Sequence, residues 1–364
     1  MNFASGSPYA MRRALERRVE TALVVAEPWP RWFLATNRAL RDLSAGRRDA
    51  EWSPRLTALA GARTVARVRA ARPDVVFALK ASPMAHLLVD EFRVVHVSDT
   101  TLHAMFGYYA GFDQFSARTR RGGEIIEAKV LRGAFLSVFP SDWARQSAIR
   151  DYGVSPDRAL EIAFGANLDP VEVRPRTVPA GEWHFLFNGI EWGRKGGQVA
   201  LDTIAELTRR GVKCRLDIVG CTANVMAGPV PGNVTFHGFV SKTMPDGVAL
   251  LHRLYSDATA LLLPTRADCF GLALSEAMHY GLPVLSTATG GVTSLIKNGV
   301  TGILLPPGAR GAAFADEAAA LLASPARYEA MSRAALADAA ARLNWDVWAK
   351  RVVEAVSERL RTDR

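Results

Sequence analysis

Two acidic residues stand out in the most informative stretch of the sequence, residues 261–291. Asp268 follows a short apolar run, and Glu276 lies eight positions further on. The apolar run at 258–263 is typical of a buried strand, and Gly271 marks the start of a helix. Such a strand–loop–helix unit places backbone amides and a helix N-terminus at the carboxyl edge of a parallel sheet, where anions bind. Two carboxylates at that edge would accept hydrogen bonds from hydroxyl-rich groups.

A second motif, FNGIEWGRKGG at residues 187–197, follows an expected strand and opens an expected helix. Gly189 and Gly193 would let the backbone approach a ligand closely. Arg194 and Lys195 put two positive charges at the start of that helix, where the helix dipole favours anions. A bound diphosphate would remove this conflict, and a solvent-facing pair of cations is the alternative explanation of the motif.

Length and composition place the chain among globular proteins. Its 364 residues exceed what one core usually fills, so two domains are expected. No apolar run reaches the roughly 20 residues that span a bilayer, and the N-terminus lacks the apolar region of a secretory signal. The three cysteines, Cys214, Cys221 and Cys269, follow no zinc-binding spacing. A reducing cytoplasm is therefore the expected compartment.

The net charge of +9 favours anionic partners such as nucleotide phosphates or a lipid surface. No motif for nucleic-acid binding is present, so nucleic acid is not expected as a partner. Peripheral membrane contact through the first helix stays open as an alternative to plain solvation. Its candidate residues are Arg12, Arg13, Arg17 and Arg18.

Strands and helices alternate along the chain, which predicts parallel sheets with helices on both faces. Expected strands in the first half are Ala22–Ala26, Asp74–Leu79, Arg93–Val97, Phe135–Phe139 and Leu160–Phe164. Expected helices there are Tyr9–Val19, Arg55–Ala70, Thr100–Phe106, Gly123–Leu131 and Ser141–Tyr152. Residues 171–183, rich in proline and polar residues, predict a linker.

The second half begins the alternation again after the linker. Its expected strands are His184–Asn188, Arg215–Val219, Val234–His237, Ala258–Leu263, Pro283–Ser286 and Gly302–Leu305. Its expected helices are Gly197–Arg210, Ala312–Leu322, Arg327–Arg342 and Trp345–Arg361.

With these motifs the chain resembles retaining glycosyltransferases of family 4. Their pattern is Glu, seven residues, Glu, then Ala-Met and Gly-x-Pro-Val. Here Asp268 stands where the first Glu is usual, and Glu276-Ala277-Met278 and Gly281-Leu282-Pro283-Val284 follow. The resemblance implies an α/β chain of GT-B fold, with two Rossmann-like domains facing each other across a cleft. The implied divisions are an acceptor-side domain at 1–175, a donor-binding domain at 176–343, and a C-terminal helix at 344–364 that crosses back to the first domain.

The resemblance also implies an activity, the retaining and metal-independent transfer of a sugar from a nucleotide diphosphate-sugar. Arg194 and Lys195 would clamp the diphosphate, Asp268 would bind the sugar, and Glu276 would bind the ribose. Further implied donor contacts are Gly189, Phe239, Cys269, Phe270, Gly271 and Leu272. UDP and GDP are the preferred nucleotides, and no cofactor is expected beyond this co-substrate.

The acceptor side is less defined. Gly6, Ser7 and Tyr9 resemble the family's loop facing the diphosphate and the acceptor. His96 and Asp99 lie where an expected strand ends, so they are expected to line the acceptor cleft. A plain turn and a helix cap explain the same residues. Only Met1–Ala4 precede the loop, where the family usually has a strand, so this first strand is either very short or absent.

Other classes lack their motifs. The sequence contains no Asp-x-Asp metal-binding triplet, no P-loop and no Gly-x-Gly-x-x-Gly fingerprint. Two alternatives to a transferase stay open, namely a non-catalytic nucleotide-sugar-binding protein and a nucleotide-sugar epimerase of the same fold. The base, sugar, acceptor, linkage and oligomeric state are not specified by any motif.

Overall fold

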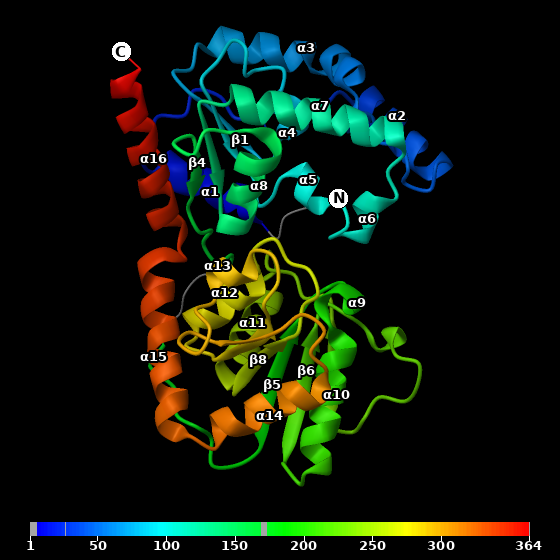
Figure 1. The fold of residues 1–364 in the computed structure, drawn as a ribbon, viewed down its shortest axis with the longest axis vertical. Helices are drawn as coiled ribbons and strands as arrows, with labels where there is room; N and C mark the ends of the chain where they lie inside the picture. Colours follow the sequence, from blue (N-terminus) through cyan, green and yellow to red (C-terminus); the bar gives the residue numbers. More distant parts are fainter. Residues whose placement is uncertain (1–5, 26, 169–172, 364) are drawn as a thin grey trace. The chain divides into compact units, whose positions relative to one another are not determined.

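The computed structural model describes residues 6–25, 27–168 and 173–363, which form two compact units. The N-terminal unit combines residues 11–162 with 349–364. The C-terminal unit combines 163–348 with the described part of 1–10. Each unit has its own parallel sheet (Figure 1).

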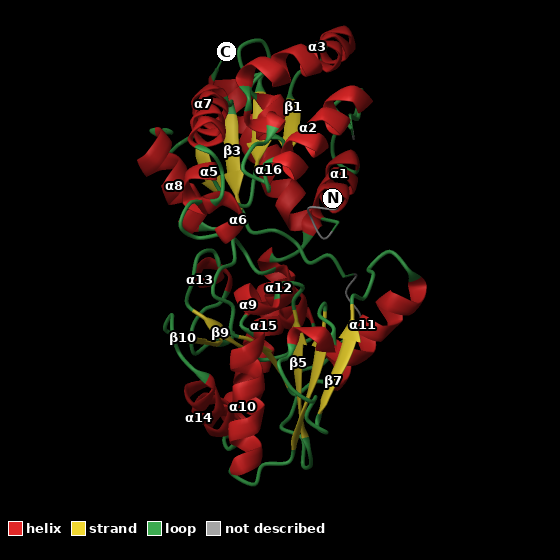
Figure 2. Ribbon diagram, turned by 90° about the vertical axis from the view of Figure 1, so that its right-hand side faces the viewer, coloured by secondary structure: helices red, strands yellow, loops and turns green. Residues whose placement is uncertain are grey.

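The N-terminal unit contains four parallel strands in the order β1-β2-β3-β4. They are β1 (Val76–Leu79), β2 (Val94–Val97), β3 (Leu136–Phe139) and β4 (Ala159–Glu161). Each strand lies beside the one that precedes it in the chain, so right-handed crossovers carry the connecting helices to the same face. Figure 2 shows α7 (Ala117–Gly133) and α8 (Asp142–Tyr152) on one side of these strands and α2 (Arg31–Leu43) on the other.

Apart from the last helix of the chain, which is described below, the remaining helices of this unit are short except for α3. They are α1 (Ser7–Glu16), which starts in the C-terminal unit, η1 (Ala50–Trp52), α3 (Pro54–Ala71), α4 (Ser82–Ala85), α5 (Leu102–Met105) and α6 (Ala110–Asp113). Ser53 caps α3, because its side chain accepts a hydrogen bond from Leu56 N. Pro54 at the first helical position has the backbone angle that a helix start requires.

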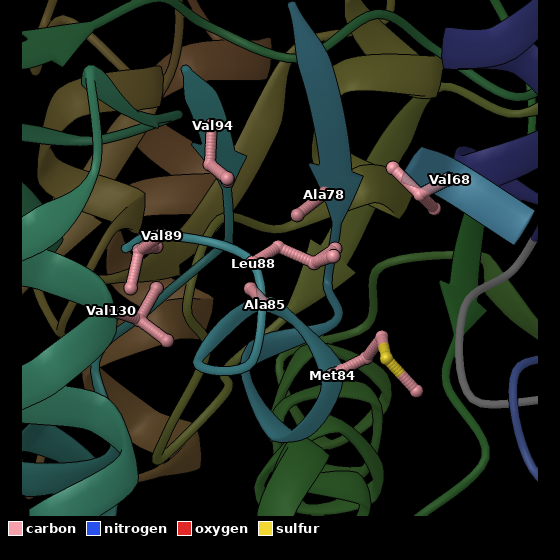
Figure 3. Packing of buried hydrophobic residues seen from close by; sticks show 8 residues of the cluster. All are labelled: Val68, Ala78, Met84, Ala85, Leu88, Val89, Val94 and Val130. Atoms are coloured by element: carbon pink, nitrogen blue, oxygen red, sulfur yellow. The ribbon is translucent and has the colours of Figure 1, made fainter. Parts of the chain in front are cut away.

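A cluster of buried apolar residues joins α3, α4 and α7 to the first two strands (Figure 3). Val89 lies next to Val130 of α7 in this cluster, which also contains Val68 of α3 and Ala78 of β1. The predicted strand Ala22–Ala26 is wrong for residues 22–25, which form no strand. Leu23 is instead partly buried by packing against this cluster. Ala26 lies outside the described residues.

The other four strands predicted in the first half are confirmed, with shifted ends. β4 stops at Glu161, so Ile162–Phe164 continue as irregular chain beyond the sheet. The predicted helix Thr100–Phe106 shortens to α5, because Thr101 is its N-cap and accepts a hydrogen bond from Ala104 N.

The C-terminal unit has six parallel strands in the order β10-β9-β8-β5-β6-β7. They are β5 (Trp183–Asn188), β6 (Cys214–Val219), β7 (Val234–Gly238), β8 (Ala260–Leu263), β9 (Val284–Thr287) and β10 (Ile303–Leu305). The chain builds outward from β5 to β7, then returns to the other side of β5 to add β8 to β10. This reversal makes a switch point between β5 and β8, where ligands of open α/β sheets bind at the carboxyl ends of the strands.

Helices cover this second sheet. They are α9 (Trp192–Lys195), α10 (Gly197–Arg209), η2 (Ala223–Val225), α11 (Pro245–Asp257), α12 (Leu272–His279), α13 (Val292–Leu295), α14 (Gly311–Leu322) and α15 (Pro325–Arg342). α10 packs against α14, and α12 packs against α15 (Figure 1). The last helix, α16 (Trp345–Thr362), starts in this unit and continues in the N-terminal unit, where Arg359 pairs with Asp157 at 3.0 Å.

The predicted linker is partly anchored. Its described residues before β5 form neither helix nor strand, but Arg176 is tightly bound within the C-terminal unit. The Arg176 guanidinium donates hydrogen bonds to four backbone carbonyls, those of Tyr255, Ser256, Ala258 and Tyr280, at 2.6 to 3.0 Å. Burial lowers the pKa of this arginine. Arg176 thereby ties the end of α11 to the end of α12 and fixes the start of β8.

Candidate functional site

The two sequence motifs meet at the switch point of the C-terminal sheet. The loop after β5 contains α9 and Gly196, and the loop after β8 starts at Pro264. Gly196 has a φ of +75°, and a Cβ atom at this position would lie 1.9 Å from the Pro264 carbonyl oxygen. The amide of Arg266 donates to the Arg194 carbonyl oxygen at 2.7 Å. The loops can approach this closely because residue 196 has no side chain.

Lys195 and Asp268 form the centre of this contact. The Lys195 ammonium donates a hydrogen bond to one oxygen of the Asp268 carboxylate. Their side chains are 14% and 11% exposed, so each charge is largely removed from water. A buried charge is costly unless it is paired, which explains why Lys195 and Asp268 pair with each other. The pair also reaches the surface, so an incoming anion or hydroxyl group could compete for either partner.

Arg194 has a different setting from the one predicted. Arg194 and Lys195 belong to the last turn of α9, with Gly196 between them and α10. Cations are favourable at a helix C-terminus, so the predicted conflict with a helix dipole does not arise in α9. The Arg194 guanidinium donates to the Ala267 carbonyl at 2.8 Å and to Glu191 at 2.7 Å. Arg194 therefore connects the loop after β5 to the loop after β8.

Glu276 has no exposed surface. One of its carboxylate oxygens accepts from the Lys242 ammonium, and the other accepts from the Tyr255 hydroxyl at 3.1 Å. Asn188, the last residue of β5, donates to the same tyrosine hydroxyl at 2.9 Å. Burial, followed by the nearby Glu276 charge, raises the pKa of Tyr255 well above its ordinary value, so this phenol stays protonated. Both acids of the motif are therefore paired with a lysine.

Between the two acids, the chain makes the turn into α12. Gly271 has a φ of +96° and forms the N-cap of this helix. Cys269 and Phe270 have buried side chains, and the Phe270 ring lies 5.7 Å from that of Phe164. Predicted ligand contacts from Phe270, Gly271 and Leu272 would thus come from the backbone amides at the helix start.

Two apolar side chains near these loops are exposed. Phe239, directly after β7, is 70% exposed, and Ile190, in the loop after β5, is 65% exposed. Gly189 precedes Ile190, and a Cβ atom on Gly189 would lie 2.8 Å from the Lys195 side chain. The contact between Phe239 and the nucleotide base therefore stays a prediction, and the exposure of this side chain is compatible with it.

The predicted loop at Gly6, Ser7 and Tyr9 falls within the C-terminal unit. Gly6 has a φ of +85° and precedes α1. Ser7 is buried, and its hydroxyl accepts a hydrogen bond from Asn167 at 2.9 Å. Trp345 in turn donates to Asn167 at 3.1 Å. Tyr9 is 59% exposed and therefore accessible to a ligand. The expected first strand at Met1–Ala4 lies outside the described residues.

The two acceptor-side candidates differ in exposure. His96 in β2 is fully buried, and its ring lies 3.0 Å from the Ser82 hydroxyl. Burial lowers the pKa of His96 to about 4, so the ring is neutral. Asp99 is one-third exposed at the end of the same strand and pairs with Lys80 at 2.7 Å. Direct contact of His96 with an acceptor would require the strand end to open, whereas Asp99 is accessible as it stands.

Four residues with roles in these networks were not predicted. They are Lys80, Asn188, Lys242 and Tyr255. Lys80 has a φ of +53°, which is unusual for a residue other than glycine and often marks a functional position. Asn188 was identifiable, because it is the last polar residue of a strand that leads to the switch point. No sequence pattern singled out Lys242, which reaches Glu276 from a loop without a motif.

Comparison with known proteins gives a family for the C-terminal unit. Residues 184–324 match the model of the family Glycosyl transferases group 1. The D-inositol 3-phosphate glycosyltransferase of Kribbella flavida is 36% identical over 287 residues, which cover 75% of this chain and 59% of that protein. The enzyme of the same name from Arthrobacter sp. (strain FB24) is 31% identical over 207 residues, covering 50% and 49%. The chain thus spans about half to three fifths of the length of these curated relatives.

Solved structures share the fold over most of the chain. The glycosyltransferase from Rickettsia africae ESF-5 aligns with a TM-score of 0.64 at 15% identity, covering 85% of this chain and 82% of that one. Anabaena Alr3699/HepE in complex with UDP-glucose aligns with a TM-score of 0.62 at 18% identity, covering 83% and 84%. Residues 184–324 thus match the family Glycosyl transferases group 1, and the chain is similar in sequence to curated glycosyltransferases and in fold to solved glycosyltransferase structures.

Proposed function

We propose that this protein transfers a sugar from a nucleotide diphosphate-sugar to an acceptor, with retention of anomeric configuration and without a metal ion. The observation that carries the proposal is the apposition of Lys195 and Asp268 at the switch point between β5 and β8. A cation and a carboxylate that face the carboxyl ends of these strands suit the two chemically different halves of such a donor, its diphosphate and its sugar.

The diphosphate would bind where α10 and α12 begin. Gly196 brings the loop before α10 against the end of β8, and Gly271 caps α12 in the loop that follows β8. Free backbone amides at helix starts bind phosphate oxygens, and the helix dipole adds to the attraction. Lys195 would exchange its contact with Asp268 for one with a phosphate oxygen. That exchange would release the Asp268 carboxylate to accept hydrogen bonds from sugar hydroxyls.

Glu276 would bind the ribose, as the family resemblance implies. Because Lys242 donates a hydrogen bond to one of its oxygens, ribose hydroxyls would have to displace Lys242 or share the carboxylate with it. Tyr255 and Asn188 keep the second oxygen fixed at the end of β5. The ribose-binding carboxylate is thus held in position before the donor arrives.

The chemistry follows from the leaving group. Breaking the bond between sugar and phosphate leaves added negative charge on the nucleoside diphosphate, and a fixed cation stabilises that charge in the transition state. The loss of one such group typically lowers the rate on the order of 100- to 1000-fold. UDP and GDP are our preferred nucleotides, and the UDP-glucose bound by the Anabaena relative supports the first of these.

A transfer assay tests this proposal. Purified protein is incubated with UDP-, GDP-, ADP- and TDP-sugars and an acceptor panel that includes D-inositol 3-phosphate, the substrate in the names of the curated relatives. The wild type should form product in the presence of EDTA, and the product should keep the anomeric configuration of the donor. Lys195→Ala should lower the rate at least tenfold. Lys297→Ala, which breaks the Lys297–Asp338 pair elsewhere in the same unit, is the matched control and should not.

The results separate the remaining possibilities. Donor binding without transfer or hydrolysis across the whole panel would replace the proposal with a nucleotide-sugar-binding role. An altered sugar released without acceptor would replace it with epimerisation. Equal transfer rates for Lys195→Ala and Lys297→Ala would show that Lys195 has no role in the reaction.

A further inference from the structure

A short segment of the N-terminal unit carries most of the net charge of the protein. Residues 31–72 contain ten arginines, no lysine and three acids, a net charge of +7, while the whole chain has +9. This segment comprises α2, η1 and α3. So much charge of one sign on two neighbouring helices repels itself, and an anionic partner would relieve that repulsion.

Most of these arginines lack an acidic partner. Arg41 pairs with Asp49 at 3.0 Å, and Arg69 pairs with Glu91 at 2.6 Å. The other eight are all exposed, and none forms an ion pair with an acid in the part of the chain that the structure describes. They are Arg31, Arg38, Arg47, Arg48, Arg55, Arg63, Arg67 and Arg72.

The two helices pack together on their inner sides. Phe33 of α2 and Ala60 of α3 are buried in one cluster with Ala50. Asn37 of α2 accepts a hydrogen bond from the Ala50 amide at 2.6 Å. The exposed arginines of α2 and α3 therefore lie on the sides of the two helices that face away from this cluster. Both helices lie in the N-terminal unit in Figures 1 and 2.

Apolar side chains are exposed among the arginines. Trp32 is 49% exposed, Leu43 is 89% exposed and Leu59 is 69% exposed. Helical spacing puts Trp32, Ala35, Ala39 and Leu43 along one stripe of α2, and Leu59, Ala62 and Ala66 along one stripe of α3. Both helices thus present apolar stripes flanked by arginines on their solvent sides.

We propose that this arginine-rich face, the outer sides of α2 and α3, docks on an anionic lipid bilayer. A basic helix face with tryptophan and leucine between the charges is suited to the headgroup boundary, where apolar side chains enter and arginines meet lipid phosphates. Nucleic acid would use the arginines but would leave Leu43 and Leu59 in water. Docking itself does not depend on the transfer reaction. If that reaction holds, the face brings the enzyme to acceptors at a membrane surface.

Vesicle co-sedimentation of the full chain tests the docking. The vesicles are phosphatidylcholine alone, or phosphatidylcholine and phosphatidylglycerol in a two-to-one ratio. The wild type should bind only the anionic vesicles. Each arginine near an anionic membrane surface raises the affinity for the membrane about fivefold. The triple variant Arg38→Gln/Arg63→Gln/Arg67→Gln loses three such contributions, so it should bind the anionic vesicles on the order of 100-fold more weakly than the wild type.

Two further variants complete the test. Arg253→Gln/Arg333→Gln/Arg351→Gln removes the same charge from exposed positions on α11, α15 and α16 and should bind within about threefold of the wild type. Trp32→Gln/Leu59→Gln keeps every arginine and should bind about tenfold more weakly. Circular dichroism confirms that each variant is folded.

Three results would overturn the proposal. One is equal binding of the wild type to neutral and anionic vesicles. Another is an equal loss of binding to anionic vesicles in both arginine triple variants. That result would show that binding depends on the net charge of the protein and not on this face. The third is a wild type that binds RNA tightly but binds no vesicles, with RNA binding unchanged in the Trp32→Gln/Leu59→Gln variant. That result would make nucleic acid the partner.

Discussion

Replacement of Gly196 by alanine should disrupt the contact between the loops after β5 and β8. A left-handed backbone at φ +75° costs a residue with a side chain about 1–2 kcal/mol. The new Cβ atom would also lie 1.9 Å from the Pro264 carbonyl oxygen, so the loops must separate. Separation breaks the hydrogen bonds between Arg266 N and Arg194 O and between Arg194 and Ala267 O, at about 1 kcal/mol each. The expected loss in the free energy of unfolding is about 3–4 kcal/mol.

Substitutions at two other glycines separate the cost of a left-handed backbone from the cost of a steric clash with the new Cβ atom. Gly211 also has a positive φ, +81°, but a Cβ there meets nothing within 4 Å, so Gly211→Ala should cost only the conformational 1–2 kcal/mol. Gly193 lies in α9 with ordinary backbone angles and open space around it. Gly193→Ala should therefore leave stability unchanged or raise it by up to about 1 kcal/mol.

Urea denaturation of the three variants, followed by circular dichroism, measures these differences. Nucleotide-sugar binding should fall for Gly196→Ala, because the loop that carries Lys195 moves away from the loop after β8. Binding should be normal for Gly211→Ala, which lies outside both loops. If Gly196→Ala were no less stable than Gly211→Ala, the close approach of the two loops would be refuted, and with it the geometry of the site.

Three further changes test the buried groups. Burial raises the pKa of Glu127 to about 7 from an ordinary 4.5, so the folded state keeps this proton longer and loses about 3 kcal/mol of stability as the pH rises from 4.5 to 7. Glu127→Gln should thus raise the melting temperature at pH 8 but not at pH 4.5, and an equal effect at both values would contradict the shift. Lys242→Ala should lower the free energy of unfolding by about 3 kcal/mol, because the buried Glu276 carboxylate loses its counter-ion. Adding Glu276→Gln should restore most of that loss in the same urea assay, and no recovery would refute the pairing. Arg176→Ala should cost about 3 kcal/mol in that assay, since four backbone carbonyls lose their donor, and a loss under 1 kcal/mol would show that Arg176 is no anchor.

The sequence was sufficient for the C-terminal sheet because its strands are short apolar runs, such as β8, or alternate apolar and polar residues, as β6 does. The two motif loops were placed correctly for the same reason, as both follow such strands. α11 was missed, although Pro245 at its first turn and the spacing of Val248, Leu251 and Tyr255 are signals of a helix. With α11 unassigned, Tyr255 could not be connected to Glu276.

The remaining failures depend on tertiary contacts that no local pattern encodes. Residues 22–25 are apolar like a strand, but Leu23 packs on a core formed by residues more than forty positions later. Lys242 and Lys195 neutralise two acids that appear available when only the sequence is read. Pairing partners of buried charges depend on which loops the fold brings together, and sequence spacing does not determine that.

Calorimetric titration with nucleoside diphosphates tests the site most directly. The wild type should bind at least one of UDP, GDP, ADP and TDP. Lys195→Ala should bind the same nucleotide about 10- to 100-fold more weakly, because a charge-assisted hydrogen bond to a phosphate is lost. Lys297→Ala should bind like the wild type. Unchanged affinity in Lys195→Ala would contradict the claim that the loops after β5 and β8 hold the diphosphate.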